Sequence, residues 1–304
     1  MNSNHTIVTE IVLLGFQNLH NLKVPLFLLF LLIYILTVCE NVLIIVLVST
    51  SRILQSPMYF FLQHLSLCDL LQSTNIAPIL LQTFVDDGAT ISLAGCLTQF
   101  YFFGGSGASQ CLLLALMAYD RYLAICHPLR YNSIMNHRAC VRSILITLVV
   151  GFSLTLVNVN AVATLRFCEQ NTINHFFCDF YPLLELSCSD ISFVQTEVTI
   201  QCAPLVLFPF ILIVVSYIYI AQAILKIISN ANRKKAFSTC SSHLAVVSIF
   251  YGTLSGVYVV PFRRQSLTIS KVLSLLYTVV IPFINPMIYS LRNNELKGAL
   301  KKTN

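Results

Sequence analysis

Residues 96–126 decide the fold, and they read CLTQFYFFGGSGASQCLLLALMAYDRYLAIC. The only charged side chains in this stretch are Asp120 and Arg121, close to its end. About 20 apolar residues suffice to cross a bilayer as a helix, whereas barrel strands are about 10 residues of alternating pattern. The stretch therefore predicts a membrane-spanning helix that is long enough to be tilted or to project from the bilayer.

Six further apolar runs of similar character lie along the chain. They cover residues 24–48, 57–81, 139–165, 196–225, 236–261 and 270–289. The whole chain is 57% hydrophobic and 10% charged, whereas about a quarter of the residues of a soluble domain are charged. We expect an all-α integral membrane protein, in which residues 1–304 form one domain with a seven-helix bundle and its loops at 24–289.

The distribution of basic residues predicts the orientation in the membrane. Thirteen of the 18 Lys and Arg residues fall on the side that holds the C-terminus. The other five are Lys23, Arg166, Arg263, Arg264 and Lys271. Basic loops stay in the cytosol, so residues 1–23 are expected outside the cell, where Asn4 begins a glycosylation sequon. No cleaved signal is evident in the first twenty residues. The net charge of +6 then reflects topology, and no nucleic-acid partner is expected.

The C-terminal residues 290–304 place three leucines among basic residues. This pattern predicts a short amphipathic helix on the cytosolic face of the lipid bilayer. A frayed basic tail is the alternative.

Polar residues inside the apolar runs are candidates for function, because burying them in a membrane is costly. Asp69 lies in the middle of the second run, Glu40 and Asn41 lie in the first, and Asn285 precedes Pro286 in the seventh. These side chains are predicted to form a polar cluster that binds a cation or water and shifts during activation. A static hydrogen-bonded contact between helices is the alternative.

The two ends of the third run predict a mechanical connection. Cys96 and Arg121 are 25 positions apart, which is about 37 Å along a helix at about 1.5 Å per residue. Asp120 can hold Arg121 at the cytosolic end until protonation or a conformational change releases it.

Five segments, in this order along the chain, carry a resemblance to a known family. They are PMYFFL at 57–62, MAYDRYLAICHPLRY at 117–131, SY at 216–217, KAFSTCSSHL at 235–244 and NPMIYSLRN at 285–293. Together they resemble the vertebrate odorant receptors, within the rhodopsin-like class. The resemblance implies a plasma-membrane receptor, expected in olfactory cilia, that has no enzymatic activity and needs no cofactor.

The resemblance also implies the pairing of the outer cysteines. By themselves Cys96, Cys168, Cys178 and Cys188 allow three pairings. The family pattern implies Cys96–Cys178 and Cys168–Cys188. A metal site at His175, Cys178 and Asp179 is a rival interpretation, but an oxidised Cys178 could not supply the thiolate.

The family pattern implies an activation switch as well. Arg121, Tyr217, His243 and Tyr289 would rearrange as the run 236–261 swings outward and opens a cytosolic groove. That groove would accept a heterotrimeric stimulatory G protein of the olfactory type and so raise cyclic AMP. Asp120, Tyr122 and Asn285 complete the expected switch. The basic residues Arg233, Lys234 and Lys235 either flank the groove or only enforce topology.

Two positions depart from the family pattern. Glu40 stands where the family has Gly, and Gln110 stands where it often has Glu. A cation site with two carboxylates is therefore in doubt, and the expected polar core is Asn41, Asp69 and Gln110. One hypothesis is that Glu40 supplies the missing charge.

The ligand pocket is expected between the outer halves of the third, fifth, sixth and seventh runs. The helical stretches there carry no charge, so a cationic amine would find no counter-ion and the ligand is expected to be small, neutral and largely apolar. Matching family positions suggest the lining Phe103, Gly104, Gly107, Ala108, Cys111, Gln201, Cys202, Leu205, Val206, Tyr251, Leu254, Ser255, Tyr258, Leu275 and Thr278. Some of these would only pack helices together, the glycines above all. Tyr251 is the best candidate to join the ligand to helix motion, and Asn158 and Asn160 are further polar candidates.

Three rival functions remain in view. A transporter or channel would show broken helices, inverted repeats or a charged path, and an enzyme would need partners for the isolated His64 and His243. A receptor for a different stimulus would share the fold. We expect a receptor whose partner is a small volatile or waterborne odorant.

Overall fold

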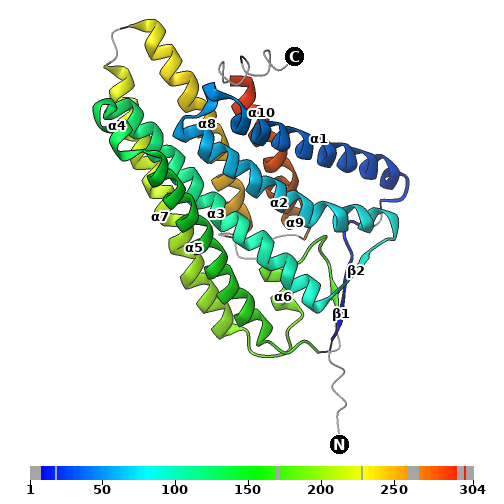
Figure 1. The fold of residues 1–304 in the computed structure, drawn as a ribbon. Coiled ribbons are helices and arrows are strands. Elements are labelled where there is room, and N and C mark those ends of the chain that lie inside the picture. Colours follow the sequence, from blue (N-terminus) through cyan, green and yellow to red (C-terminus); the bar gives the residue numbers. More distant parts are fainter. Residues whose placement is uncertain are drawn as a thin grey trace, which may run out of the picture.

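Helix α3, Leu93–Cys126, is the central element of the computed structural model, which describes residues 8–17, 19–168, 171–226, 229–258, 267–292 and 298. It begins where the side chain of Ser92 accepts a hydrogen bond from the backbone N–H of Gly95 at 3.0 Å, as an N-cap does. It packs against α2, α5, α7 and α8 and is the most buried of the apolar helices. The helix predicted at residues 96–126 therefore forms the core of the bundle (Figure 1).

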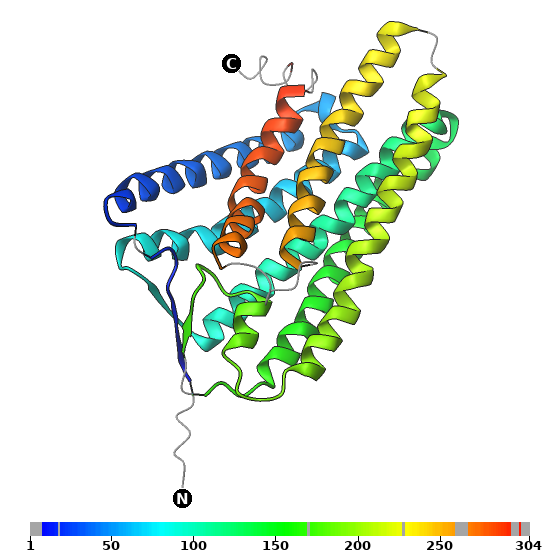
Figure 2. The same ribbon diagram turned by 180° about the vertical axis from the view of Figure 1, so that it is seen from behind.

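Six other spans surround α3 and complete the expected bundle of seven (Figures 1 and 2). They are α1 Lys23–Thr50, α2 Pro57–Val85, α5 His137–Ala163, α7 Ser192–Leu225, α8 Asn230–Tyr258, and a seventh span made of α9 Leu267–Leu275, a π-helical turn Leu276–Val280 and α10 Ile281–Arg292. Within the described residues, five of the seven spans are long and apolar enough to cross a membrane by length and composition alone. The other two, α2 and α8, carry buried polar side chains such as Asp69 and His243.

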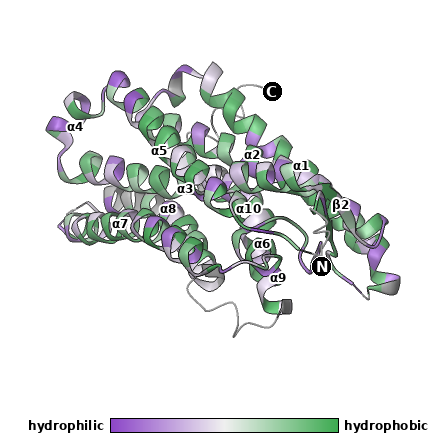
Figure 3. Ribbon diagram, turned by 90° about the horizontal axis from the view of Figure 1, so that it is seen from below, coloured by the Kyte–Doolittle hydropathy of each residue, from purple (hydrophilic) through white to green (hydrophobic). Residues whose placement is uncertain are grey.

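The outer surface of the bundle is apolar. Leu32 on α1, Val149 on α5 and Ile211 on α7 all expose about half or more of their surface. In Figure 3 the helices are mostly hydrophobic along their length, and hydrophilic residues gather near α4, at one end of the bundle. Such a surface is stable in lipid and not in water.

Asn41 repairs the break that a proline makes in the seventh span. Pro286 has no N–H and cannot bond the carbonyl oxygen of Pro282, four residues earlier. Asn41 Nδ2 donates to that oxygen at 3.1 Å and to the carbonyl oxygen of Thr37 at 2.9 Å. The predicted polar-core residue Asn41 thus joins α1 to α10.

A small sheet, which was not predicted from the sequence, lies at the outer end of the bundle. Strand β1, Glu10–Leu13, pairs antiparallel with β2, Ala89–Ser92, and parallel with β3, Thr172–Ile173. The strand order is β2-β1-β3, so the N-terminal segment is the central strand. Ile11 and Leu13 of β1 and Phe180 belong to a second apolar cluster, separate from the core of the bundle.

Two short helices lie in the loops, at opposite ends of the molecule (Figure 1). They are α4, Pro128–Ile134, after α3, and α6, Phe180–Glu185, between α5 and α7. Short 3-10 turns at His20–Leu22 and Arg52–Leu54 precede α1 and α2. Of the predicted tail helix at 290–304, the structure describes residues 290–292, which end α10, and Gly298. The sequon at Asn4 lies outside the described residues.

Candidate ligand cavity and signalling switch

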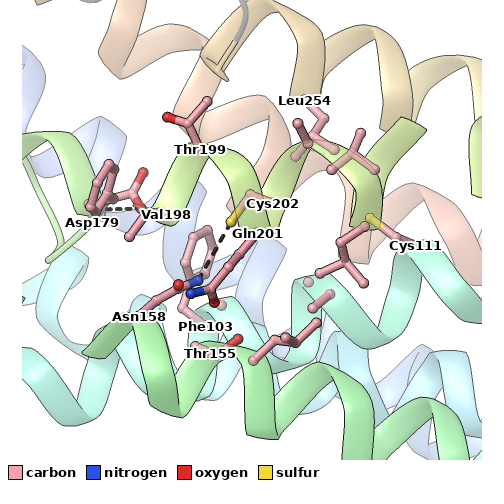
Figure 4. A pocket seen from close by; sticks show the side chains of 18 of the residues that line it. Phe103, Cys111, Thr155, Asn158, Asp179, Val198, Thr199, Gln201, Cys202 and Leu254 are labelled. Atoms are coloured by element: carbon pink, nitrogen blue, oxygen red, sulfur yellow. Dashed lines mark hydrogen bonds between the residues drawn. The ribbon is translucent and has the colours of Figure 1, made fainter. Parts of the chain in front are cut away.

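A cavity of about 350 Å³ lies between α3, α5, α7 and α8, and the loop that contains α6 closes one side of it. It falls in the range of small-molecule sites, about 300–1,000 Å³. Figure 4 shows Asp179 at one side of the cavity and Cys111 at the other. Because α3 runs inward from Cys96, the side near Cys111 is the deeper one.

Most of the residues suggested for the lining do lie in the cavity wall. They are Phe103, Gly104, Gly107, Ala108, Cys111, Gln201, Cys202, Leu205, Val206, Leu254 and Ser255. Their side chains are mainly apolar, and they come from α3, α7 and α8. The structure therefore places these three helices where the family positions suggested.

Three suggested residues are not part of the wall. Tyr251 packs against Phe210 and Phe250 and donates its hydroxyl hydrogen to the carbonyl oxygen of Cys111 at 3.4 Å, so it lies behind the wall. Leu275 is also absent from the lining, and Thr278 borders a separate small crevice next to α1 and α2. The side chain of Tyr258 lies outside the described residues.

The π-helical turn explains the misplacement on the seventh span. Leu275 and Thr278 were suggested from matching family positions, and the extra residue in such a turn changes which side chains face the cavity. Tyr277 faces the cavity instead, with its ring edge-on to Phe103 at a centroid distance of 5.5 Å. A Cβ atom at Gly107 would collide with the Tyr277 hydroxyl, so the glycine makes room for it.

The part of the cavity wall that the loop between α5 and α7 supplies was not predicted from the sequence. The disulfide Cys96–Cys178 ties this loop to α3, and the second bond, Cys168–Cys188, lies within the loop; these are the pairs that the family resemblance implies. Gln99 Oε1 accepts the backbone N–H of Cys178 at 2.8 Å. The next residue, Asp179, thereby enters the cavity wall as a buried carboxyl that caps α6.

Helix α5 contributes more of the cavity than the sequence suggested. Leu154, Thr155 and Asn158 line it, whereas the side chain of Asn160 is exposed outside it. The remaining additional lining residues are Phe100, Phe180, Tyr181, Val198, Thr199, Ala203 and Leu207. Asn158, an amide within an apolar run, was one of the two polar candidates suggested on this helix, and it does line the cavity.

A buried lysine fastens the outer cap to the seventh span. Lys271 on α9 is 8% exposed, and its Nζ donates to the carbonyl oxygen of Gly15 at 2.6 Å and to Asn174 Oδ1 at 2.7 Å. Burial in this cap, and then repulsion by Lys271, lower the pKa of His175 to about 3. His175 is therefore neutral at physiological pH.

Asp69 is the centre of the polar core. It accepts hydrogen bonds from Gln110 Nε2 at 2.8 Å and from Asn285 Nδ2 at 3.1 Å, and so joins α2, α3 and α10. Glu40 is not among its hydrogen-bond partners in the described part of the chain. The cluster contains one carboxyl, as expected from Gln110.

At the end of α3 far from Cys96, the carboxyl of Asp120 holds two partners. Arg121 pairs with Oδ2 and Tyr131 of α4 donates to Oδ1 at 2.7 Å. Tyr122 contacts His127 through its hydroxyl at 2.9 Å. The arginine expected to meet a partner is thus held by its neighbour.

Two further switch residues are joined directly. Tyr217 on α7 and Nδ1 of His243 on α8 are hydrogen-bonded at 2.7 Å, and both residues are buried. Tyr289 on α10 is 1% exposed, and its hydroxyl has no hydrogen-bond partner within the described residues. The residues expected to form the switch therefore connect α7 to α8, and Nε2 of His243, like the Tyr289 hydroxyl, is buried without a hydrogen-bond partner in the described part of the chain.

Comparison of structures defines the class of protein first. The squid rhodopsin crystal structure resembles this chain with a TM-score of 0.74 and 17% sequence identity, covering 93% of this chain and 80% of that one. This likeness shows that the chain has the seven-helix fold of that structure.

Sequence comparison then gives the family. A family model described as "Olfactory receptor" matches residues 30–303. Olfactory receptor 5G9 of Mus musculus is 47% identical over 99% of this chain and 96% of its own length. Olfactory receptor 11L1 of Homo sapiens is 45% identical over 98% and 93%. The chain belongs to the olfactory receptor family of G-protein-coupled receptors, which are receptors and not enzymes.

Proposed function

We propose that this protein is an odorant receptor that binds small, largely apolar molecules in the cavity between α3, α5, α7 and α8. The observation that carries the proposal is the cavity itself, about 350 Å³ in volume and lined mainly by apolar side chains. A neutral ligand was expected because the helical stretches around the pocket carry no charge. Asp179 in the wall extends the class to molecules that carry one polar or basic group.

The cavity wall is connected to the helix that is expected to move. Tyr251 of α8 bonds the carbonyl oxygen of Cys111, a lining residue of α3. Two turns nearer the cytosol, His243 of α8 bonds Tyr217 of α7. A ligand that displaces the wall near Cys111 would favour a different position of α8. The population of receptors would then shift toward the state with an open cytosolic end.

The cytosolic partner proposed is a stimulatory G protein of the olfactory type, which raises cyclic AMP. Leu129 on α4 is fully exposed beside Arg130, at the end of the bundle where this partner is proposed to bind. The proposal places the protein in the plasma membrane, in olfactory cilia, with the N-terminus outside and Asn4 glycosylated.

A cyclic-AMP assay with an odorant panel tests this function. Ala108→Phe fills the cavity from α3, and Ala221→Phe on the exposed face of α7 adds the same bulk away from it. We expect odorant responses in the wild type and in Ala221→Phe, none in Ala108→Phe at equal surface expression, and none in cells lacking the stimulatory α subunit. Full responses in Ala108→Phe, or in the deficient cells, would contradict the proposal.

A further inference from the structure

The outer part of the cavity has a polar wall, which we define as Thr155, Asn158, Asp179, Thr199 and Gln201. All five residues line the cavity and come from α5, α7 and the residue before α6. Figure 4 shows them on the side away from Cys111 and Leu254. The deeper part, around Cys111, Leu205 and Val206, is apolar. The cavity therefore has one polar and one apolar end.

Each of the two amides of the polar wall donates one N–H hydrogen bond to another side chain of the protein. Asn158 Nδ2 donates to the Cys202 sulfur at 3.6 Å, and Gln201 Nε2 donates to Glu197 Oε1 at 3.3 Å. Turning the Gln201 amide around would set its oxygen against the Glu197 carboxylate, so the charge fixes its orientation. Asn158 Oδ1 and Gln201 Oε1 are two buried oxygens without a hydrogen-bond partner among the described residues.

The threonine hydroxyls of the polar wall also donate their hydrogens to other protein groups. Thr155 donates to the carbonyl oxygen of Gly151 at 2.9 Å, and Thr199 donates to that of Gln195 at 2.6 Å. Each hydroxyl therefore offers only lone pairs to the cavity. Asp179 adds a carboxyl whose Oδ1 accepts the backbone N–H of Phe180 at 2.8 Å. The polar wall is thus rich in acceptors, while both threonine hydroxyls and one N–H of each amide are already engaged.

We propose that the cavity selects odorants whose polar head group donates hydrogen bonds, and that it holds this head group at Asn158 and Gln201 beside Asp179. Buried acceptors left without a donor carry a desolvation cost, which a hydroxyl or amine removes and a carbonyl or ether does not. The carbon skeleton extends toward Cys111. This inference rests on the proposed function, because it names the ligand class of the same cavity.

The test uses probes that share a skeleton and differ in the head group. Cyclic-AMP responses are measured for 1-octanol, octylamine, octanal and heptyl methyl ether, and for the phenylethyl and cyclohexyl counterparts of each. The donors, alcohol or amine, are expected to act at concentrations about tenfold or more below the acceptor-only aldehyde and ether. Equal or greater potency of the aldehyde and ether overturns the inference and leaves the proposed function intact. Silence to every probe, at verified surface expression, contradicts both.

Variants locate the effect in the polar wall. Gln201→Met and Asn158→Leu keep approximate size and remove an acceptor, so each is expected to raise the effective concentration of the donor probes about tenfold, with little change for the ether. Gln195→Met, on an exposed part of α7 outside the cavity, is the matched control and should change nothing. Equal loss for donors and ether in both wall variants would assign the wall to shape alone and overturn the inference.

Asp179→Asn separates the two kinds of donor. Asparagine keeps the cap on α6, because both residues serve as N-caps. If only the amine response is lost, the amine binds as an ammonium group paired with the carboxyl. If the alcohol and amine responses are both retained, the donor binds without needing the charge of Asp179. Either result supports the acceptor-rich wall. Gain of the aldehyde and ether responses at the expense of both donors would contradict it.

Discussion

Tyr131 donates its hydroxyl hydrogen to Oδ1 of Asp120 at 2.7 Å, while Arg121 pairs with Oδ2 of the same carboxyl. The short helix α4 therefore shares the acid that holds Arg121, the arginine of the proposed switch. Burial, and then the charge of Asp120, raise the pKa of Tyr131, so its hydroxyl stays protonated and remains a donor. Movement of α4 would change how firmly Arg121 is held.

Tyr131→Phe should raise signalling without odorant. A hydrogen bond to a charged group contributes about 1.5 kcal/mol, which corresponds to about a tenfold shift in the ratio of active to resting receptor if the bond exists only at rest. The readout is basal cyclic AMP per receptor at the surface. Tyr119→Phe, one helix turn from Tyr122 on an exposed face of α3, is the control and should leave basal signalling unchanged. Unchanged basal signalling in Tyr131→Phe would remove α4 from the switch.

Lys271→Met should destabilise the outer cap. The substitution leaves the carbonyl oxygen of Gly15 and Asn174 Oδ1 without their donor, at a cost of about 1–3 kcal/mol for a buried acceptor. Lys23→Met is the comparison, because Lys23 pairs with the exposed Asp87, and such surface pairs contribute about 0–1 kcal/mol. Thermal unfolding of the purified receptor measures both. Equal stability of the two variants would show that the Lys271 contacts do not hold the cap.

Acidification should weaken the same cap through His175. Its folded pKa of about 3 lies below the ordinary 6.5, so the unfolded state takes up a proton first as the pH falls. The stability contribution is complete above pH 6.5 and is lost on the way down to about pH 3. At pH 5.5 the loss is about 1.4 kcal/mol.

Melting temperatures at pH 7.5 and 5.5 test that expectation. The decrease should shrink in His175→Gln and persist in His137→Gln, which changes an exposed cytosolic histidine. The same decrease in the wild type and in His175→Gln would show that another group is responsible.

Asn41→Leu should loosen the seventh span. The Pro282 carbonyl would lose the donor that replaces the missing N–H of Pro286, at a cost of about 1–3 kcal/mol. Thr50→Val removes a hydroxyl that donates to the carbonyl oxygen of Val46 within α1, on an exposed face, and serves as the control. Thermal unfolding in detergent should show the larger decrease for Asn41→Leu. No difference between them would mean that the carbonyl finds another donor.

The spans were predictable because each one is a long run of mostly apolar residues, as a membrane-spanning helix requires. Long, mostly apolar runs marked all seven, although α2 and α8 are less apolar than the other five, and the ends differed from the structure by only a few residues, as at α3, Leu93–Cys126. The strand Glu10–Leu13 was not predictable, because four residues carry too little pattern and their partners lie far away in the sequence.

The cavity was predictable where regular helices line it and not elsewhere. Phe103, Ala108 and Cys111 follow one face of α3 and do line it. Tyr277 was missed because the π-helical turn is invisible in an apolar sequence. Asp179 was missed because its position depends on how the loop folds back over the bundle once Cys178 is bonded to α3.

The central claim is that occupancy of the cavity is transmitted to Arg121. Its most direct test measures binding and signalling separately in the same three receptors, the wild type, Arg121→Ala and Ala108→Phe, with an odorant that activates the wild type. The account predicts that Arg121→Ala binds this odorant with little change and produces no cyclic AMP, whereas Ala108→Phe does neither. A full cyclic-AMP response in Arg121→Ala would contradict it.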